Sequence, residues 1–336
     1  MIPHNRPTIG EEEEIAATRV LRNGWLAQGE EVEKFENEFC DFLGLPHGHA
    51  VALSSGTASL FLALHVLNAE NKKILFPGYV CSALRHAVSM ANGKEQLVDI
   101  SSNSPNISDS DIKTTEYDIS IIPHMYGLPV NFEKNTNCII EDCCQSLGAK
   151  VNDEFVGLKG DIGIFSFYVT KLMTSGGFGG MVVSNDLSRI NEIRNFIEYD
   201  GKLDDKLHFN FQMGNLQAAI GREQLKKIPK FLQRREEIFS MYKEAGLELI
   251  DVEDDNDSIK PVRFRALMKT SKSKELIKKL RENDIISVTI QNDPIMSKYP
   301  TKFSNSLELI EHTISLPIYP SLLDEEISKI ISVIKN

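Results

Sequence analysis

The sequence has no long hydrophobic run, and this shortage excludes a class of protein. No apolar segment of the 336 residues approaches the ~20 residues of a membrane-spanning helix. The first residues, MIPHNRPTIGEEEE, also lack the apolar core of a secretory signal. We therefore expect a cytoplasmic protein without a membrane partner.

Basic residues are in deficit as well. The 37 basic residues stand against 48 acidic ones, which gives a formal net charge of −11, and there is no basic tract. An acidic chain without such a tract is a poor ligand for nucleic acid. The partners that remain are small molecules and other proteins.

Cysteine is scarce and odd in number. The five cysteines are Cys40, Cys81, Cys138, Cys143 and Cys144. The adjacent pair lies in an apolar run and not at the spacing of metal ligands, so we interpret all five as reduced thiols and expect no metal site.

Short apolar runs alternate with helical stretches over the first two thirds of the chain. The expected strands cover 49–55, 73–77, 95–100, 118–124, 137–142, 162–167 and 179–184, with helices over 57–69 and 81–91. This alternation predicts an α/β fold, a three-layer sandwich with a mostly parallel central sheet. Ligands of such sheets bind beyond the carboxyl ends of the strands.

The pattern changes after about residue 216. A long, charged helix is expected over 215–246, followed by a short α+β tail. We predict a large ligand-binding domain over 1–225, and a bridging helix with a small C-terminal α+β domain over 226–336.

Three motifs carry candidate chemistry, and the first is the turn in VALSSGTASLFLAL. It leads from a strand into a helix that starts at Thr57 and Ala58. Backbone amides and small hydroxyl residues at a helix N-terminus form an anion site. A helix that is simply capped uses the same residues, so this motif alone leaves both interpretations open.

The second motif, CIIEDCCQSLGA, runs an apolar strand into Glu141 and Asp142. An acid at the end of a buried strand is costly unless it is paired, so the motif indicates either a nearby charged ligand group or a helix-capping aspartate. Such a carboxylate can hold a protonated ring nitrogen.

The third motif, FSFYVTKLMTSGGFGG, places Lys171 between an aromatic-rich strand and a glycine loop. A partly desolvated lysine loses its proton readily, and its amine then attacks aldehydes. A surface lysine is the alternative. Together, however, the phosphate turn, the strand-end acid, Ser166 and Lys171 are what a phosphorylated pyridine aldehyde requires.

These residues lie in a longer series of motifs that resembles a known family. The series is NGWLAQGEEVEKFENEF, SSGTASLFLAL, LVDI, PHMYGLPV, IIEDCCQSLGA, GDIGIFSFYVTK with GGFGG, FNFQMGNLQAAIGREQL and ISLPIYPSL. It resembles the DegT/StrS family of pyridoxal-phosphate-dependent sugar aminotransferases, which have the fold type I architecture of aspartate aminotransferase. The resemblance extends over nearly the whole chain.

The resemblance implies roles for individual residues. Lys171 would bind pyridoxal 5'-phosphate covalently and shuttle the proton, and Asp142 would pair with the pyridine nitrogen. Further implied cofactor contacts are Gly56, Thr57, Ala58, Tyr79, Gln145 near the phenolic oxygen, Ser166 and Asn210. Asn210 would reach the phosphate of the neighbouring subunit, so the active sites of a homodimer would be shared. Residues 1–30, with Trp25, would lie near the active-site entrance, although core burial is an equal alternative for Trp25.

Three positions depart from the family pattern. Gln212 stands where an arginine is usual, which puts a carboxylate or phosphate contact in doubt. Either Tyr79 or Cys81 takes the place of the usual aromatic that stacks on the cofactor, and we favour Tyr79. Tyr168 stands where histidine is frequent and would either assist proton movement or pack.

The expected function is transfer of an amino group from an amino acid, L-glutamate by analogy, to a keto group of a nucleotide-linked deoxysugar. Lys171 argues against the related branch that dehydrates sugars, because that branch has histidine there. The alternatives are the same chemistry on a non-nucleotide keto sugar, or a non-catalytic regulator that keeps the fold. A nucleotide would need a local basic cluster, for which Lys202, Lys206 and Arg222 are candidates.

Overall fold

The centre of the molecule is a seven-stranded sheet, described here by a computed structural model that covers residues 1–200, 204–252, 258–291 and 294–336. The strands follow the order β1-β9-β8-β5-β4-β2-β3. They are β1 (Ala50–Leu53), β2 (Lys73–Pro77), β3 (Lys94–Val98), β4 (Ile119–Pro123), β5 (Cys138–Asp142), β8 (Ile162–Ser166) and β9 (Gly180–Val183). Only β9 runs antiparallel to its neighbours. The predicted α/β class with a mostly parallel sheet is confirmed.

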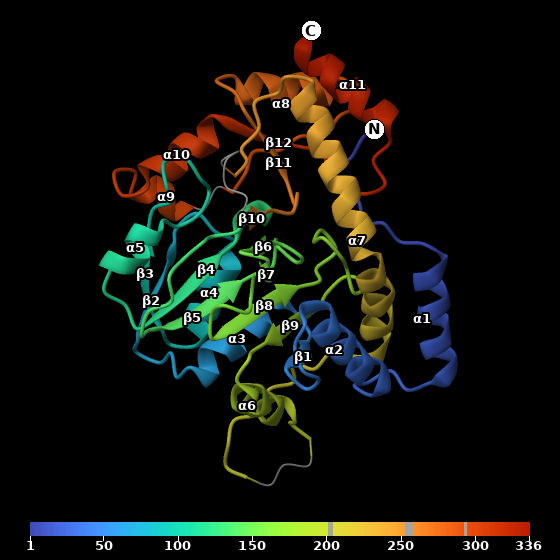
Figure 1. Ribbon diagram of the computed structural model, residues 1–336, viewed down its shortest axis with the longest axis vertical. Helices are drawn as coiled ribbons and strands as arrows, with labels where there is room; N and C mark the ends of the chain where they lie inside the picture. The colour runs from blue at the N-terminus through green and yellow to red at the C-terminus, as the bar shows by residue number, and fades with distance from the viewer. Residues whose placement is uncertain (201–203, 253–257, 292–293) are drawn as a thin grey trace.

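Helices cover this sheet. Every residue of β1, β4 and β9 is buried, as expected for strands whose two faces are both covered. The cover comes from α2 (Glu30–Leu43) on β1, α3 (Gly56–Val66) on β8 and β9, and α4 (Ser82–Met90) on β3. The remaining helices of this part are α5 (Asp109–Thr114), the 3-10 turn η1 (Met125–Gly127) and α6 (Leu187–Ile197), which lies at the lower end in Figure 1.

One long helix, α7 (Asn215–Glu244), extends from beside the central sheet to the C-terminal part (Figure 1), and it connects the two largest hydrophobic cores of the described residues. It packs against α1 (Glu11–Asn23) and α2, and its far end reaches α11 (Asp324–Lys335). Leu225 and Ile228 belong to the large core, whereas Ile238 and Tyr242 belong to the small one. The helix therefore crosses the domain boundary predicted after residue 225. The division into two domains stays a prediction.

The small core surrounds the antiparallel pair β11 (Ala266–Lys269) and β12 (Thr313–Leu316). Helices α8 (Ser273–Glu282) and α11 pack on this core, whereas Met296 of α9 (Pro294–Lys298) and Phe303, which precedes α10 (Ser304–Glu311), belong to the large core. A third sheet joins β10 (Ile259–Lys260) to β6 (Lys150–Val151) and β7 (Glu154–Phe155) of the large part. In the described ranges no helix combines the length and the apolar character that crossing a membrane requires.

The N-terminal segment ties the small core to the central sheet. Ile2 packs in the small core, and its amide donates a hydrogen bond to the carbonyl of Asp284. Three residues later, the side-chain amide of Asn5 donates to the carbonyl of Thr170 at 2.8 Å. The start of the chain therefore fixes the backbone next to Lys171.

Candidate active site

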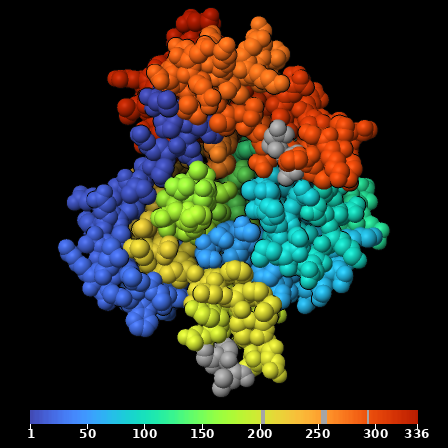
Figure 2. Space-filling model, turned by 180° about the vertical axis from the view of Figure 1, so that it is seen from behind, coloured from blue at the N-terminus to red at the C-terminus, as the bar shows by residue number. Residues whose placement is uncertain are grey.

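The carboxyl ends of β1, β5 and β8 meet at one edge of the sheet, because these strands run in the same direction. A cavity of about 530 Å³ lies beyond this edge. The predicted site residues that line it are Gly56, Thr57, Asp142, Gln145, Ser166 and Lys171. Figure 2 shows this side of the molecule, where the segments near residues 57, 85 and 170 meet. Motifs that are distant in sequence thus converge on one space.

The turn between β1 and α3 places backbone amides at the cavity. Ser55 caps α3, and its Oγ accepts a hydrogen bond from the amide of Ala58 at 3.1 Å. Ala58 itself does not line the cavity, but Gly56 and Thr57 do. Amides in the first turn of a helix have no partner within the helix, so these two are suited to bind an anion.

Glycine at position 56 allows this turn to approach β8 closely. A Cβ atom there would lie 2.8 Å from the Cβ and 3.1 Å from the Oγ of Ser166, which is closer than real side chains pack. The Ser166 hydroxyl at the end of β8 therefore lies beside the helix N-terminus. Together they form a cradle of the kind that holds a phosphate group.

Asp142 ends β5, and its side chain belongs to a residue only 8% exposed. Its Oδ1 accepts a hydrogen bond from the amide of Cys144 at 3.0 Å, which fixes the carboxylate at the cavity. Burial, with the charge of Asp142 next to it, raises the pKa of the Cys144 thiol well above its ordinary value. Cys144 therefore lines the cavity as a neutral thiol. Asp142 supplies the carboxyl group of the cavity, which is suited to pair with a cationic ring nitrogen.

Lys171 projects from the loop that follows β8. Its amide donates to the carbonyl of Tyr168 at 2.8 Å, so the backbone makes a turn at this point. The Nζ atom lies 5.5 Å from the centre of the Phe264 ring, which precedes β11. The lysine therefore has a neighbour from the segment before β11, whose ring packs in the large core.

Gln145 is held at the cavity by its neighbours. Its Oε1 accepts a hydrogen bond from the amide of Tyr126 at 2.7 Å, and its Nε2 lies 3.9 Å from the sulfur of Met125. With the oxygen occupied by a donor, the amide presents its N–H groups to a ligand. This orientation suits contact with an oxygen of a bound group.

Tyr79 does not face the cavity. It is fully buried, and its hydroxyl hydrogen-bonds to the hydroxyl of Tyr126 at 2.8 Å. Burial raises the pKa of Tyr79 well above its ordinary value, so the hydroxyl stays protonated and keeps this bond. The residues that line the cavity from this segment include Val80 and Cys81. Of the two residues considered for stacking, the structure places Cys81, not Tyr79, at the cavity.

Asn210 does not line the cavity of its own chain. The rings of Phe209 and Phe211 stack at 5.4 Å, and both contact Phe61 on α3. Because the two neighbouring rings pack inward, Asn210 lies exposed on the surface. Its predicted contact with a neighbouring subunit stays a prediction.

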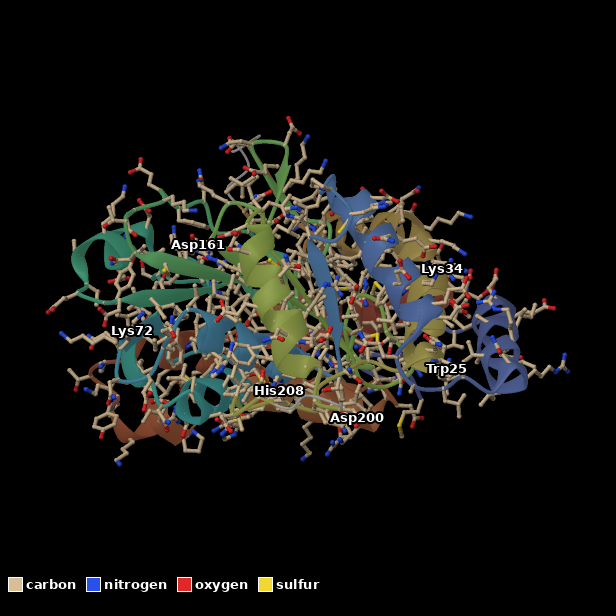
Figure 3. All side chains as sticks on the ribbon, turned by 90° about the horizontal axis from the view of Figure 1, so that it is seen from below. Trp25, Lys34, Lys72, Asp161, Asp200 and His208 are labelled. Atoms are coloured by element: carbon tan, nitrogen blue, oxygen red, sulfur yellow. The ribbon has the colours of Figure 1, made fainter. Side chains whose placement is uncertain are left out.

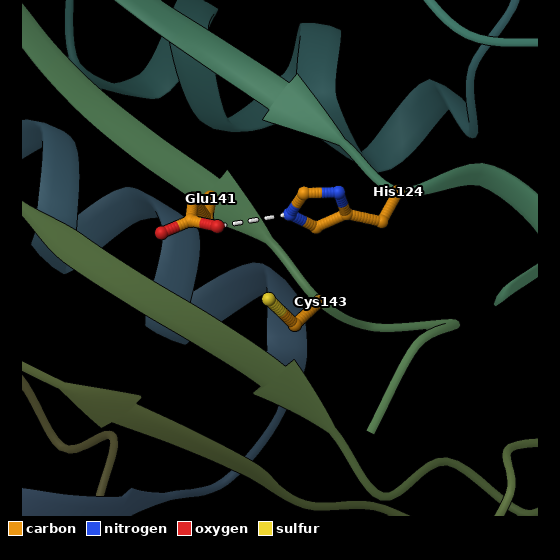
Figure 4. A group of neighbouring side chains, drawn as sticks. All are labelled: His124, Glu141 and Cys143. Carbon is orange, nitrogen blue, oxygen red and sulfur yellow. Dashed lines mark hydrogen bonds and ion pairs between the residues drawn. The ribbon is translucent and has the colours of Figure 1, made fainter. Parts of the chain in front are cut away.

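A buried cluster lies behind the acid of the site (Figure 4). Glu141 accepts a hydrogen bond from His124 Nε2 at 3.0 Å and further bonds from the amides of Gly157 and Gly160. Burial alone would raise the pKa of Glu141, but these hydrogen bonds, with His124 the largest, hold it below its ordinary value.

The second ring nitrogen of His124 accepts a hydrogen bond from the amide of Val130 at 2.9 Å. Cys143 lies beside Glu141 and His124, and burial raises the pKa of its thiol well above its ordinary value. Because Glu141 and His124 already have partners and Cys143 stays protonated, these three residues form a structural cluster rather than a metal site. His124 packs with its hydrogen bonds satisfied.

The residues considered for a basic cluster, and Trp25, lie on the surface or in ion pairs where the structure describes them. Arg222 is held by Glu38 and Glu31 at 2.6 and 2.7 Å, so it does not offer a free charge to a nucleotide. Lys206 is exposed, and Lys202 lies outside the described residues. Trp25 is 63% exposed and lies on the outside of the molecule near α2 (Figure 3), so it is not a core residue.

Sequence reasoning missed Phe178 at the rim of the cavity and Arg265 next to Phe264. Tyr168 and Phe178 line the cavity as exposed aromatics, 42% and 66% exposed, with their rings 5.5 Å apart. Tyr168 was considered but Phe178, in the glycine loop, was not. Arg265 lies over the ring of Phe264, which is the neighbour of Lys171. The sequence signal for it is a charged residue directly before the apolar strand β11.

A lysine, a strand-end acid and a phosphate cradle surround one cavity at the edge of a mainly parallel sheet, an arrangement suited to a phosphorylated pyridine aldehyde. The chain belongs to the DegT/DnrJ/EryC1/StrS aminotransferase family, which matches residues 7–335. It is therefore an aminotransferase with pyridoxal 5'-phosphate as its cofactor.

Named relatives match the chain over nearly its full length. GDP-perosamine synthase of Escherichia coli O157:H7 is 29% identical over 350 residues, which cover 97% of this chain and 95% of the relative. A UDP-N-acetyl-3-dehydro-alpha-D-glucosamine 3-aminotransferase of Acidithiobacillus ferrooxidans is 27% identical and covers 95% of this chain and 91% of its own.

Solved structures show the same fold. The aminotransferase TlmJ from Streptoalloteichus hindustanus superposes with a TM-score of 0.90 at 19% identity, over 99% of this chain and 98% of that one. The PLP form of the putative sugar aminotransferase Spr1654 from Streptococcus pneumoniae also has a TM-score of 0.90, at 20% identity, over 99% and 97% of the two chains.

Proposed function

We propose that this aminotransferase moves an amino group from L-glutamate to a keto group of a nucleotide-linked deoxysugar. The observation that carries the transamination is the convergence of Lys171, Asp142 and the Gly56 turn on one cavity. The acceptor class rests on the relatives, whose names refer to GDP- and UDP-linked sugars and which match over nearly the whole chain.

In this proposal Lys171 and Asp142 are the catalytic residues. The bound pyridine ring supplies an electron sink for the negative charge that develops at the substrate carbon. Asp142 keeps the ring nitrogen protonated, because its fixed, buried carboxylate favours a cationic partner. Lys171 anchors the cofactor and then removes the proton from Cα of the donor, and returns a proton to the sugar carbon.

The remaining predicted residues position the cofactor. The amides of Gly56 and Thr57 and the hydroxyl of Ser166 would bind its phosphate, and the Gln145 amide would face the phenolic oxygen. Ala58 contributes through its bond to the Ser55 side chain, which fixes the turn. Cys81, which lines the cavity, would stand next to the ring in place of an aromatic.

We further propose that the enzyme is a homodimer in the cytoplasm, and that two subunits complete each site. Asn210 is exposed between two inward-packed phenylalanines, and the rim aromatics Tyr168 and Phe178 are uncovered in the single chain. A second copy that covers this rim would bring its Asn210 to the phosphate end of the cavity.

The test follows the absorption of the purified protein with added pyridoxal phosphate, and then with L-glutamate. We expect a visible band of the lysine-bound cofactor, which disappears when glutamate donates its amino group. Lys171→Ala should lose the band and the reaction while it keeps the wild-type circular dichroism. Turnover of glutamate by this variant at the wild-type rate would contradict the proposal.

The second half-reaction identifies the acceptor. The amino form of the enzyme is mixed with GDP- or UDP-linked keto-deoxysugars, and return of the visible band is measured. Reaction with a nucleotide-linked sugar supports the proposal, and its position of amination follows from the product. Reaction with a free keto sugar alone would assign the alternative acceptor.

A further inference from the structure

Three arginines lie around the strand that enters the small core, and they differ in their partners. Arg263 is paired with Glu236 and Asp251. Arg235 is fully buried, and its Nη1 lies within hydrogen-bonding distance of the carbonyls of Arg263, Phe264 and Ile318. Both side chains therefore have clear structural roles.

Arg265 forms no ion pair with any residue that the structure describes. Its guanidinium carbon lies 4.8 Å from the centre of the Phe264 ring, and its Nη1 donates to Nδ1 of His4 at 3.0 Å. Burial lowers the pKa of Arg265, while the nearby Tyr126 acts in the opposite direction. A shielded cation without an anion is costly, and an anionic ligand would remove this cost.

His4 does not supply the missing negative charge. Burial, and then the charge of Arg265, lowers the pKa of His4 to about 3. Its Nε2 hydrogen-bonds to the hydroxyl of Ser315 at 2.8 Å, while Nδ1 accepts from Arg265. The neutral imidazole orients the guanidinium through one nitrogen atom, and the other N–H groups of Arg265 have no described acceptor.

The charged groups of Arg265 and Lys171 both lie near the ring of Phe264. The Lys171 Nζ is 5.5 Å from the centre of Phe264, and Arg265 lies over that ring as well. An amino acid that reacts at Lys171 carries a carboxylate within a few ångströms of its amino group. Because both side chains lie near the Phe264 ring, their charged groups are no more than about 10 Å apart, and a guanidinium binds carboxylates through two parallel hydrogen bonds.

We propose that Arg265 binds a carboxylate group of the amino donor. This inference rests on the proposed function, since it takes an amino acid to be the donor. It adds a specificity-determining residue from the segment before β11, so that the small core contributes to recognition of the donor.

The experiment compares Arg265→Leu and Arg265→Lys with the wild type. The matched control is Arg281→Leu, which removes an exposed arginine of α8 that has no ion pair in the described structure. Single-turnover reaction with L-glutamate is followed by absorption. Binding of glutarate, the donor skeleton without its amino group, to the cofactor-free protein is measured by calorimetry.

We expect Arg265→Leu to raise the half-saturating glutamate concentration about 30-fold or more, the range for loss of one partner of a buried charge pair. The half-saturating glutamate concentration of Arg265→Lys should lie between those of the wild type and Arg265→Leu, because lysine keeps the charge but cannot form two parallel hydrogen bonds. Glutarate affinity should fall in parallel, and Arg281→Leu should behave as the wild type. L-alanine has a single carboxylate and shows which group of the donor is bound. If Arg265→Leu weakens saturation by L-alanine as much as saturation by L-glutamate, Arg265 binds the α-carboxylate. If the effect on L-alanine is smaller, Arg265 binds the distal carboxylate.

Unchanged glutamate saturation and glutarate binding in both variants would overturn the inference. A loss confined to the sugar half-reaction would do so as well, and would assign Arg265 to the diphosphate of the acceptor. If the wild type fails to react with glutamate, the proposed donor is wrong, while the glutarate titration still decides whether Arg265 binds a carboxylate.

Discussion

Asp142 is the residue whose chemistry can be separated most cleanly from its packing. Asp142→Asn keeps an oxygen that can accept the hydrogen bond from Cys144, so the loop after β5 should keep its conformation. The neutral amide cannot hold the ring nitrogen protonated, so the rate should fall about 100-fold or more while the cofactor still binds.

The measurement is the single-turnover rate with glutamate beside a titration with pyridoxal phosphate. Asp161→Asn is the control, since Asp161 is an aspartate directly before β8 that pairs with Arg189 at 3.0 Å. A near-normal rate in Asp142→Asn would leave the acid with a structural role only.

Gly56 tests the phosphate cradle by its shape. Gly56→Ala places a Cβ atom 2.8 Å from that of Ser166, so the turn must move away from β8. We expect the cofactor-free protein to lose about 1–3 kcal/mol of unfolding free energy, the usual cost of overpacking. Affinity for pyridoxal phosphate should fall as well, because the amides and the hydroxyl separate.

A second substitution distinguishes the two effects. Ser166→Gly in the Gly56→Ala background removes the clashing Cβ and should restore the stability measured by urea unfolding. The cofactor affinity should stay low, since the hydroxyl is gone. Full recovery of affinity in the double variant would show that Ser166 does not hold the phosphate.

Individual residues were predictable where local sequence determines their place. Asp142, Ser166 and Lys171 follow apolar strands, and the carboxyl ends of parallel strands meet at one edge, so the sequence alone brings them to the cavity. Tyr79 was misplaced because its partner, Tyr126, belongs to another strand's loop. Arg265 was missed although it is a charged residue directly before an apolar strand, because nothing local shows that its partner is His4, 261 residues away in sequence.

At the scale of elements, the N-terminal segment makes stability depend on pH. The His4 imidazole is neutral in the folded protein, with its pKa lowered to about 3, whereas in the unfolded chain it has the ordinary value of 6.5. Between these values the unfolded chain binds the extra proton, so this contribution to stability is complete above the unfolded pKa and is lost as pH falls toward 3.

We expect the wild type to lose about 1 kcal/mol more unfolding free energy than His4→Gln between pH 7.5 and 5.5. Glutamine can accept from Arg265 and donate to Ser315, so the variant keeps the local contacts while it removes the titrating group. Urea unfolding at several pH values measures the slopes. His86→Gln, on the exposed side of α4, is the control, and equal slopes for the wild type and His4→Gln would contradict the argument.

Elements were predicted well where hydrophobic runs are buried on both faces. The strands expected at 73–77, 118–124 and 162–167 correspond to β2, β4 and β8. The alternation could not show that β9 runs antiparallel, because strand direction follows from how the chain crosses the sheet and not from residue pattern. The joining of Ile2 to the small core was equally hidden, since it depends on a contact between the two ends of the chain.

At the scale of the whole molecule, the proposed dimer makes each site depend on two chains. Lys171 would act in its own subunit, and Asn210 in the site of its partner. Lys171→Ala should abolish the reaction, and Asn210→Ala should weaken cofactor binding and slow turnover at limiting pyridoxal phosphate. A mixed dimer has one Lys171→Ala chain and one Asn210→Ala chain. Both substitutions would then lie in the same active site, and the other active site would be intact.

Mixing therefore tests the shared site directly. The two variants are combined in equal amounts, allowed to exchange subunits, and assayed at limiting cofactor. Random exchange should restore about a quarter of the wild-type activity, because half of the dimers are mixed and each has one intact site. Sedimentation of the wild type should give the mass of two 37.8 kDa chains. A dimer that exchanges subunits without any recovery would place Asn210 in its own subunit's site or outside the reaction, and a monomer of full activity would exclude the shared site altogether.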